Sequence, residues 1–598
     1  MLDPDSRTLY SNLLRPPPGY TFDGAVATTY SLDLSTLLTV PLYLVLFHGE
    51  QDRDALLRDP IALLEALRRT AARIRVFCQQ GLISAPGKGR TLFALLEPVV
   101  KEAVAPNGGA FHPKLWLLRF LAADPEEPPL LRLAVLSRNL TADRSWDLAL
   151  VLEGHPGGRR RAENADLAKL VEFLYQASEE QVAIPDLVDE LRRTRWELPP
   201  GYEELRFHVL GLRRRAWRPA PSDRLAVISP FCSEEALAQL ASTTREPAAL
   251  ISRPEELLKL SPEAWSAFGR TLVLAEQAET EDGEEAPGEV EHLRGLHAKA
   301  YIAKKGWNTH LYVGSANATN AALRHGQSVE VLAELVGRAS QVGSIDRLLG
   351  QDGLGAVLED FEAPAEPVAM DPALEAAELA LESARRALAA AGLRLSCEGD
   401  ADAWHVTLTP ASPVRLEGIA SIRTWLVTQP AEWAVDAEPL AHAAPIGLPP
   451  ASLASISSFA AFEITASAAP RKIRFVLNLP IVGVPAARDA AVLRSVIQDR
   501  NAFLRYLMLL LSGLGESMLG SGGADGQAIG RGWGSGLPDE DSSPLLEDLT
   551  RALCRDPSRL RSIQRLVKDL KGQDQHDVVP EAFLELWDVF EAVVEEVA

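Results

Sequence analysis

The chain has 598 residues and a hydrophobic content of 47%, so it is too long for a single core and should form several globular domains. Its net charge of −22 excludes a protein that binds nucleic acid with its whole surface, but it allows a local basic groove. The first residues are acidic where a secretory signal is basic, and no apolar run is long enough to span a bilayer. We therefore expect a cytoplasmic protein without a membrane contact. A reducing compartment also fits the four cysteines, which have no paired spacing: Cys78, Cys232, Cys397 and Cys554.

Strand and helix patterns alternate along the first part of the chain. An apolar strand over 25–32 precedes a helix, and a similar strand over 225–231 also precedes a helix. The alternation predicts an α/β fold with a mixed or mostly parallel sheet, and its recurrence predicts an internal duplication. We expect two similar halves, residues 1–205 and 206–363, packed face to face as a pseudo-dimer.

Each predicted half contains the same short motif, a His-x-Lys followed after a strand's length by Ser-x-Asn. A hairpin would place the His, Lys and Asn side chains side by side, because side chains alternate along each strand. Two imidazoles, two ammonium groups and two carboxamides are what a phosphodiester-cleaving site needs when it holds no metal or cofactor. The candidate catalytic residues are therefore His112, Lys114 and Asn139 in the first copy and His297, Lys299 and Asn317 in the second.

With this doubled motif the chain resembles the phospholipase D superfamily, which includes phospholipases, cardiolipin synthases, tyrosyl-DNA phosphodiesterases and metal-independent nucleases. The resemblance covers about residues 20–340. Where the family motif usually has an Asp, this sequence has Arg119 and Lys304, and tyrosyl-DNA phosphodiesterases likewise lack that Asp. In the family, an acidic residue beyond the Asn can take over its orienting role. Asp147 and Glu330 stand at such positions, and Ser137 and Ser315 are further supporting candidates.

The resemblance implies a phosphohistidine mechanism, with His112 as nucleophile and His297 as general acid. We expect a nuclease that cleaves DNA in a bacterial restriction or phage-defence system. An enzyme acting on lipid head groups and a non-catalytic phosphate-binding scaffold are the alternatives. Arginines interleaved with Trp196 and Trp217 suit phosphate contact and base stacking, or else form solvated faces. These arginines are Arg159, Arg160, Arg161, Arg192, Arg193, Arg195, Arg213, Arg214, Arg215 and Arg218.

Beyond residue 363 the sequence changes character. A linker and a helix that begins at Asp371-Pro372 are predicted over 364–396, and alternating apolar residues predict a small β-rich domain over 397–488. The remainder, 489–598, is predicted to be helical with a flexible Gly-rich insert. This region contains no catalytic constellation, so we expect it to contact the substrate or a partner such as a helicase, an ATPase or another defence-system protein. The sequence leaves the oligomeric state open.

Overall fold

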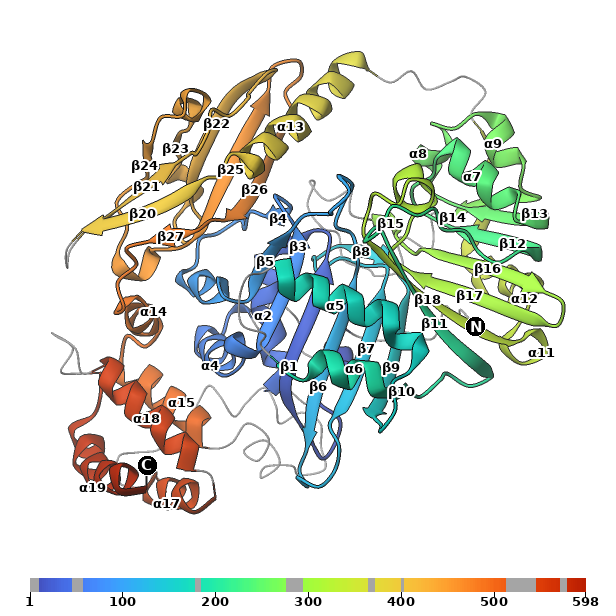
Figure 1. Cartoon of the computed structure of the whole chain (residues 1–598). Coiled ribbons are helices and arrows are strands. Elements are labelled where there is room, and N and C mark those ends of the chain that lie inside the picture. The colour runs from blue at the N-terminus through green and yellow to red at the C-terminus, as the bar shows by residue number, and fades with distance from the viewer. Residues whose placement is uncertain are drawn as a thin grey trace.

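The computed structural model describes residues 10–45, 57–177, 184–275, 294–363, 371–399, 403–511, 545–555, 557–570 and 578–597 (Figure 1). The predicted Gly-rich insert lies outside these residues. The fold is α/β, as predicted, with two mixed sheets followed by a β-rich unit and a helical region.

Within the described residues, the first half forms a seven-stranded sheet in the order β10-β9-β7-β6-β1-β3-β5. Three of its strands run parallel: β1 (Tyr20–Thr29), β3 (Ile74–Gln79) and β5 (Val100–Ala103). The sheet continues with antiparallel strands: β6 (Leu115–Ala122), β7 (Leu130–Leu136), β9 (Ala149–Pro156) and β10 (Thr194–Trp196). Its outer face is covered by α2 (Leu34–Val45) and α4 (Pro60–Thr70), which share one core with β1 and β6.

The second half repeats this arrangement in an eight-stranded sheet, as far as the structure describes it, in the order β11-β18-β17-β16-β12-β13-β14-β19. Its strands are β11 (Tyr202–Leu210), β12 (Ser222–Ile228), β13 (Thr244–Ile251), β14 (Arg270–Leu274), β16 (Ala300–Lys305), β17 (Asn308–Gly314), β18 (Glu330–Arg338) and β19 (Leu358–Asp360). Six neighbouring strands match the first sheet in order and direction, which confirms the predicted duplication. The expected boundary at residue 205 falls inside β11, and all of β11 pairs with the second sheet.

The two sheets share a hydrophobic core that also includes α5 (Ala165–Ala177) and α6 (Leu187–Arg193). Leu117 and Leu133 enter it from the first sheet, and Ile302 and Leu311 enter it from the second. Two backbone links join the halves directly. β8 (Arg144–Trp146) pairs in parallel with β15 (Arg294–Leu296), and Phe111 forms a parallel bridge with Val329. Figure 1 shows β8 and β15 side by side between the halves.

The region after residue 370 begins with α13 (Pro372–Ala390), which starts as predicted with Asp371 capping the helix through a 2.9 Å bond from Ala373 N. A β-rich unit follows, built around the strands β20 (Arg394–Gly399), β21 (Trp404–Thr409), β22 (Ile419–Leu426), β25 (Phe459–Ala466) and β26 (Lys472–Asn478). One of its sheets continues into the first half, because β26 pairs with β4 (Ile83–Ser84). An edge strand offers unpaired backbone groups, and β4 satisfies some of those on β26.

The helical region packs against the outer face of the first half. It consists of α14 (Arg488–Val496), α15 (Arg500–Leu511), α17 (Leu545–Arg555), α18 (Pro557–Leu570) and α19 (Glu581–Val597). Its apolar side chains share the core of α2 and α4, and Arg68 on α4 forms a 3.0 Å ion pair with Asp569 on α18. Among the described helices, none combines the length and the apolar character that a membrane crossing requires.

Candidate active site

Each motif histidine lies just before a strand of its own half, and the other half holds its backbone. His112 N donates to Val329 O at 3.0 Å, and His297 N donates to Trp146 O at 2.8 Å. These bonds continue the two backbone links between the halves. The two motifs are therefore brought to one place, at the junction of the sheets.

Each histidine also faces the acidic residue of the opposite half. His112 Nδ1 lies 2.9 Å from Glu330 Oε2, whereas His297 Nδ1 lies 3.3 Å from Ser137 O and 3.6 Å from Asp147 Oδ1. Because every one of these partners is an acceptor, Nδ1 carries the hydrogen on both rings and Nε2 remains available for chemistry. Glu330 and Asp147 thus each lie beside the histidine of the opposite half, across the junction.

The two motif serines hold the acidic residues in place. Ser137 Oγ donates to Asp147 Oδ1 at 3.2 Å and accepts from Leu148 N at 2.8 Å. Ser315 Oγ likewise donates to Glu330 Oε2 and accepts from Val331 N at 3.0 Å. Both serines support the histidines indirectly, through the carboxylates.

The two motif lysines are fully buried beside the histidines. Lys114 Nζ donates to His112 O at 3.1 Å, and Lys299 Nζ donates to His297 O at 2.7 Å. Burial and the nearby Lys299 ammonium hold the pKa of Lys114 well below its usual range, and burial lowers the pKa of Lys299 to about 8. A bound anion such as a phosphodiester would favour the charged form of both lysines.

Burial also governs the charge of the imidazoles. It lowers the pKa of His112 to about 4, although the Glu330 carboxylate acts in the opposite direction. Burial and then the Lys299 ammonium lower the pKa of His297, against the effect of Asp147. In the protein without substrate, both rings are therefore mainly neutral at pH 7.

The two motif asparagines differ in how their side chains are held. Asn139 Oδ1 accepts a 3.3 Å bond from Tyr30 N, which leaves its NH₂ group free to donate to a substrate. Asn317 Oδ1 is buried and has no hydrogen-bond partner in the described part of the chain. Thr29 and Ser229 occupy equivalent positions in the two halves, because their hydroxyl groups form matching hydrogen bonds. Tyr30 therefore corresponds to Pro230, which has no backbone N–H to donate to Asn317.

The position of the missing motif Asp lies far from the imidazoles. Arg119 is near the distal end of β6, about 20 Å along the extended chain from His112. There it pairs with Asp23 at 2.6 Å and with Glu190 at 2.7 Å. Lys304 occupies the matching place on β16. The absence of the Asp therefore leaves the surroundings of the imidazoles intact.

Two residues near the site were not among the sequence candidates. The Tyr30 ring lies edge-on to the His112 ring, with 4.8 Å between centroids. Arg253 Nε donates to Leu296 O at 2.7 Å and so fixes the backbone just before His297. Tyr30 directly follows the first buried strand, which is the signal that could have identified it. Nothing in the local pattern distinguishes Arg253 from other surface arginines.

The structure corrects the interpretation of the arginine clusters with aromatic residues. Trp196 and Trp217 are both buried, and Trp217 packs against Tyr301 and Tyr312, so neither can stack on a base. Of the arginines, Arg192 pairs with Glu172 and Arg193 with Asp189, as structural contacts. Eight of the arginines are exposed: Arg159, Arg160, Arg161 and Arg195, and the four of the loop that contains Arg213, Arg214, Arg215 and Arg218.

No group of three or more His, Cys, Asp or Glu side chains within the described residues has an arrangement that could hold a metal ion. Two buried ammonium groups lie at the centre of the site, and positive groups of this kind repel a cation. The side chains gathered at the junction are therefore suited to an anion.

Comparison by sequence finds no matching family model and no matching curated protein. Comparison by structure finds the yeast tyrosyl-DNA phosphodiesterase, which is 13% identical over 56% of this chain and 85% of that chain, with a TM-score of 0.32. It also finds the phosphatidylserine synthase of Haemophilus influenzae, which is 10% identical over 59% of this chain and 84% of that chain, with a TM-score of 0.28. The two halves share a duplicated α/β arrangement, and their junction pairs the two copies of the motif.

Proposed function

We propose that the chain is a phosphodiesterase that cleaves nucleic acid without a metal ion, through a phosphohistidine intermediate. The observation that carries this proposal is the pair of imidazoles from opposite halves, each with an acceptor at Nδ1 and a free Nε2. Two buried lysines accompany them, and these lack an anionic partner of their own within hydrogen-bonding distance in the described residues.

The reaction would proceed in two displacements. In the first, Nε2 of neutral His112 attacks phosphorus, and the bond from phosphorus to the leaving oxygen breaks as protonated His297 transfers its proton to that oxygen. In the second, water attacks phosphorus, His297 takes a proton from that water, and the nitrogen–phosphorus bond breaks. The lysines and the asparagine NH₂ groups stabilise the charge on the non-bridging oxygens.

The geometry favours His112 as the nucleophile. Phosphorylation places a positive charge on the attacking ring, and a carboxylate in contact with Nδ1 stabilises that charge. His112 lies 2.9 Å from Glu330, whereas His297 lies 3.6 Å from Asp147. The closer carboxylate therefore supports attack by His112.

The exposed arginine loop supports a polyanionic substrate. Within the described part of the chain, no hydrogen bond or ion pair engages the side chains of Arg213, Arg214, Arg215 and Arg218. The residue just before the loop contacts the segment that leads to His112: Asn107, five residues before His112, donates from Nδ2 to Gly211 O at 2.8 Å. A row of cations suits the repeated phosphates of a nucleic acid better than the single phosphate of a lipid head group.

The deciding experiment is a single-turnover reaction on labelled DNA in the presence of EDTA. Wild-type protein should cleave the DNA. His297→Ala should lose about 10²–10⁴-fold in rate, because it lacks the general acid of the first step. It should also accumulate an acid-labile covalent adduct, because it lacks the base that activates water in the second step. His112→Ala should form no adduct and should serve as the matched control.

Other results would contradict the proposal in distinct ways. Complete loss of cleavage in EDTA with rescue by magnesium would rule out the metal-free mechanism. Turnover of phosphatidyl substrates with DNA left intact would support the lipid alternative. Binding of phosphate without turnover of either substrate would indicate a scaffold, and an adduct on His297 in the His112→Ala protein would reverse the two roles.

A further inference from the structure

The hairpin between β16 and β17 presents an indole to solvent on a firmly held turn. Trp307 is 90% exposed, although its backbone oxygen accepts a 2.9 Å bond from Ala339 N. The preceding Gly306 has a φ of +57°, which the tight turn requires, and its N donates to Asp223 Oδ2 at 2.7 Å. Since the backbone is held on both sides, the exposure of the indole is a feature of the fold.

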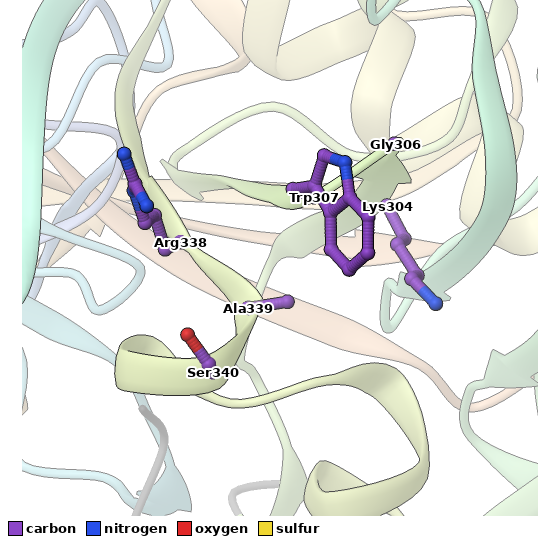
Figure 2. Close-up of a pocket in the computed structure, with 6 residues that line it drawn as sticks. All are labelled: Lys304, Gly306, Trp307, Arg338, Ala339 and Ser340. Carbon is purple, nitrogen blue, oxygen red and sulfur yellow. The ribbon is translucent and has the colours of Figure 1, made fainter.

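A hollow of about 670 Å³ lies beside this indole. Figure 2 shows the Trp307 ring between the Lys304 side chain and the strand that carries Arg338, with Ser340 nearby. Arg338 Nε lies 3.7 Å from Glu203 Oε1, but both side chains are more than half exposed, so solvent weakens that pair. The hollow therefore combines an open aromatic face, two cationic groups and a hydroxyl group.

We propose that this hollow binds one nucleotide of a single-stranded nucleic acid, with the base stacked on Trp307 and the phosphates on its two sides held by Lys304 and Arg338, which lie on opposite sides of the indole. Stacking on an aromatic side chain accepts any base, because every base has a π-face. In a chain with a net charge of −22, a local pair of cations attracts a polyanion to this place on the surface. The inference rests on the proposed function in that the bound strand is the substrate of the histidine pair.

Charge and shape favour a nucleic acid over a membrane at this hairpin. A tryptophan flanked by cations also occurs at membrane surfaces, but binding there depends on a sizeable apolar area. The neighbours of Trp307 in the turn are Lys305, Gly306 and Asn308, which add no apolar side chain of appreciable size.

The position of the hollow predicts a dependence on substrate length. Along the extended strand, Trp307 lies about 25 Å from Lys299 at the histidine pair. At a rise of about 3.4 Å per nucleotide or more, a strand of about eight nucleotides is enough to reach both places. A dinucleotide at the catalytic pair would not reach Trp307.

The test compares Trp307→Ala with wild type on a single-stranded oligonucleotide of about 12 nucleotides and on a small chromogenic phosphodiester. For the oligonucleotide, the variant should have a KM about 5- to 150-fold higher with kcat unchanged, as the loss of one stacked base predicts. For the small diester, both constants should be unchanged. Trp307→Phe should retain most of the affinity, and Trp433→Ala, which removes another exposed indole, should behave as wild type.

Equilibrium binding of the same oligonucleotide to His112→Ala protein separates this inference from the proposed function. If wild type hydrolyses nothing, the proposed function fails, while weaker binding after Trp307→Ala in that background still supports the hollow. The inference is overturned if the oligonucleotide does not bind, or if it binds equally well with and without the Trp307 indole. It is also overturned if Trp433→Ala weakens oligonucleotide binding as much as Trp307→Ala does. If Trp307→Ala weakened binding to anionic phosphatidylglycerol vesicles and left binding to the oligonucleotide unchanged, the hairpin would be a membrane contact instead.

Discussion

At the scale of single residues, the two halves of the site are similar in composition but not in their hydrogen bonds. Tyr30 N fixes the Asn139 side chain, and the matching Pro230 cannot fix Asn317. The carboxylate is closer to the imidazole at His112 than at His297. A site that uses one histidine as nucleophile and the other as acid needs such a difference between its halves.

Replacement of the two asparagines should separate structural from chemical roles. Asn139→Ala should lower the free energy of unfolding by about 1 kcal/mol, because Tyr30 N loses its acceptor. Asn317→Ala is the matched control and should cost little stability, because its Oδ1 has no donor in the described residues. Urea denaturation of both variants measures the difference, while both should lose phosphodiesterase activity. Equal destabilisation would contradict the role assigned to Tyr30.

The pH dependence of activity should reflect the lowered pKa values of the histidines. Catalysis needs His112 neutral and His297 protonated, so kcat/KM should be bell-shaped. The acidic limb should lie near pH 4, where His112 becomes protonated, and the alkaline limb below the usual imidazole value of about 6.5. Asp147→Asn should move the alkaline limb to lower pH, because the carboxylate raises the pKa of His297. A rate that keeps rising up to pH 8 would contradict these assignments.

At the scale of elements, the hairpins β6–β7 and β16–β17 carry the motifs, and the contact between β4 and β26 attaches the β-rich unit to the first half. Glu102 lies at this contact. It accepts bonds from Gly81 N at 2.8 Å and from Asn478 N at 3.0 Å. Even so, burial raises its pKa to about 7.

This buried carboxyl should make the stability of the protein depend on pH. Because the folded-state pKa of Glu102 is raised, its ionisation opposes folding, and stability falls as pH rises from about 4.5 through 7. Glu102→Gln removes the charge, but its NH₂ group cannot accept a bond from a backbone N–H, so the variant should be less stable than wild type near pH 5. It should lack the loss of up to about 3 kcal/mol that wild type undergoes between pH 5 and pH 8, so the gap should narrow or reverse at pH 8. Urea denaturation at both pH values measures this, with the exposed Glu398→Gln as control. A constant difference between the two pH values would contradict the prediction.

At the scale of the whole molecule, one chain brings together two motif copies, and α13 from the later region docks on the same half as Tyr30. Arg385 on α13 donates to Gly81 O at 3.0 Å, and Gln80 donates to Ala389 O at 3.1 Å. The β-rich unit is thus joined to the catalytic halves by a helix as well as by a sheet. The predicted partner, a defence-system helicase or ATPase, stays a prediction, as do the phage-defence role and DNA as the substrate.

A mixing experiment tests whether one chain makes one site. His112→Ala chains mixed with His297→Ala chains should stay inactive, because each chain pairs its own two histidines across the junction of its own halves. The measurement is cleavage of DNA by the mixture, with wild-type protein at the same concentration as control. Recovery of a sizeable fraction of wild-type activity would mean that the motifs pair between chains.

The sequence alone was sufficient for the duplication, for the first strand and helix and the hairpin of each half, and for the choice of the six candidate catalytic residues. These features are local: buried strands are apolar runs, and His112 and Lys114 share a face because side chains alternate with a period of two. The start of α13 at Asp371-Pro372 was predictable for the same reason, since a helix cap depends on adjacent residues.

Only the tertiary structure decided which acid faces which histidine. His112 and Glu330 are 218 residues apart, and their contact depends on the packing of two sheets and on the bridge between Phe111 and Val329. Packing likewise buried Trp196 and Trp217, which an aromatic-and-basic pattern had suggested for base stacking, and left Trp307 exposed on its turn. Burial and long-range pairing are properties of the assembled core, and periodicity along the chain does not report which surface another element will cover.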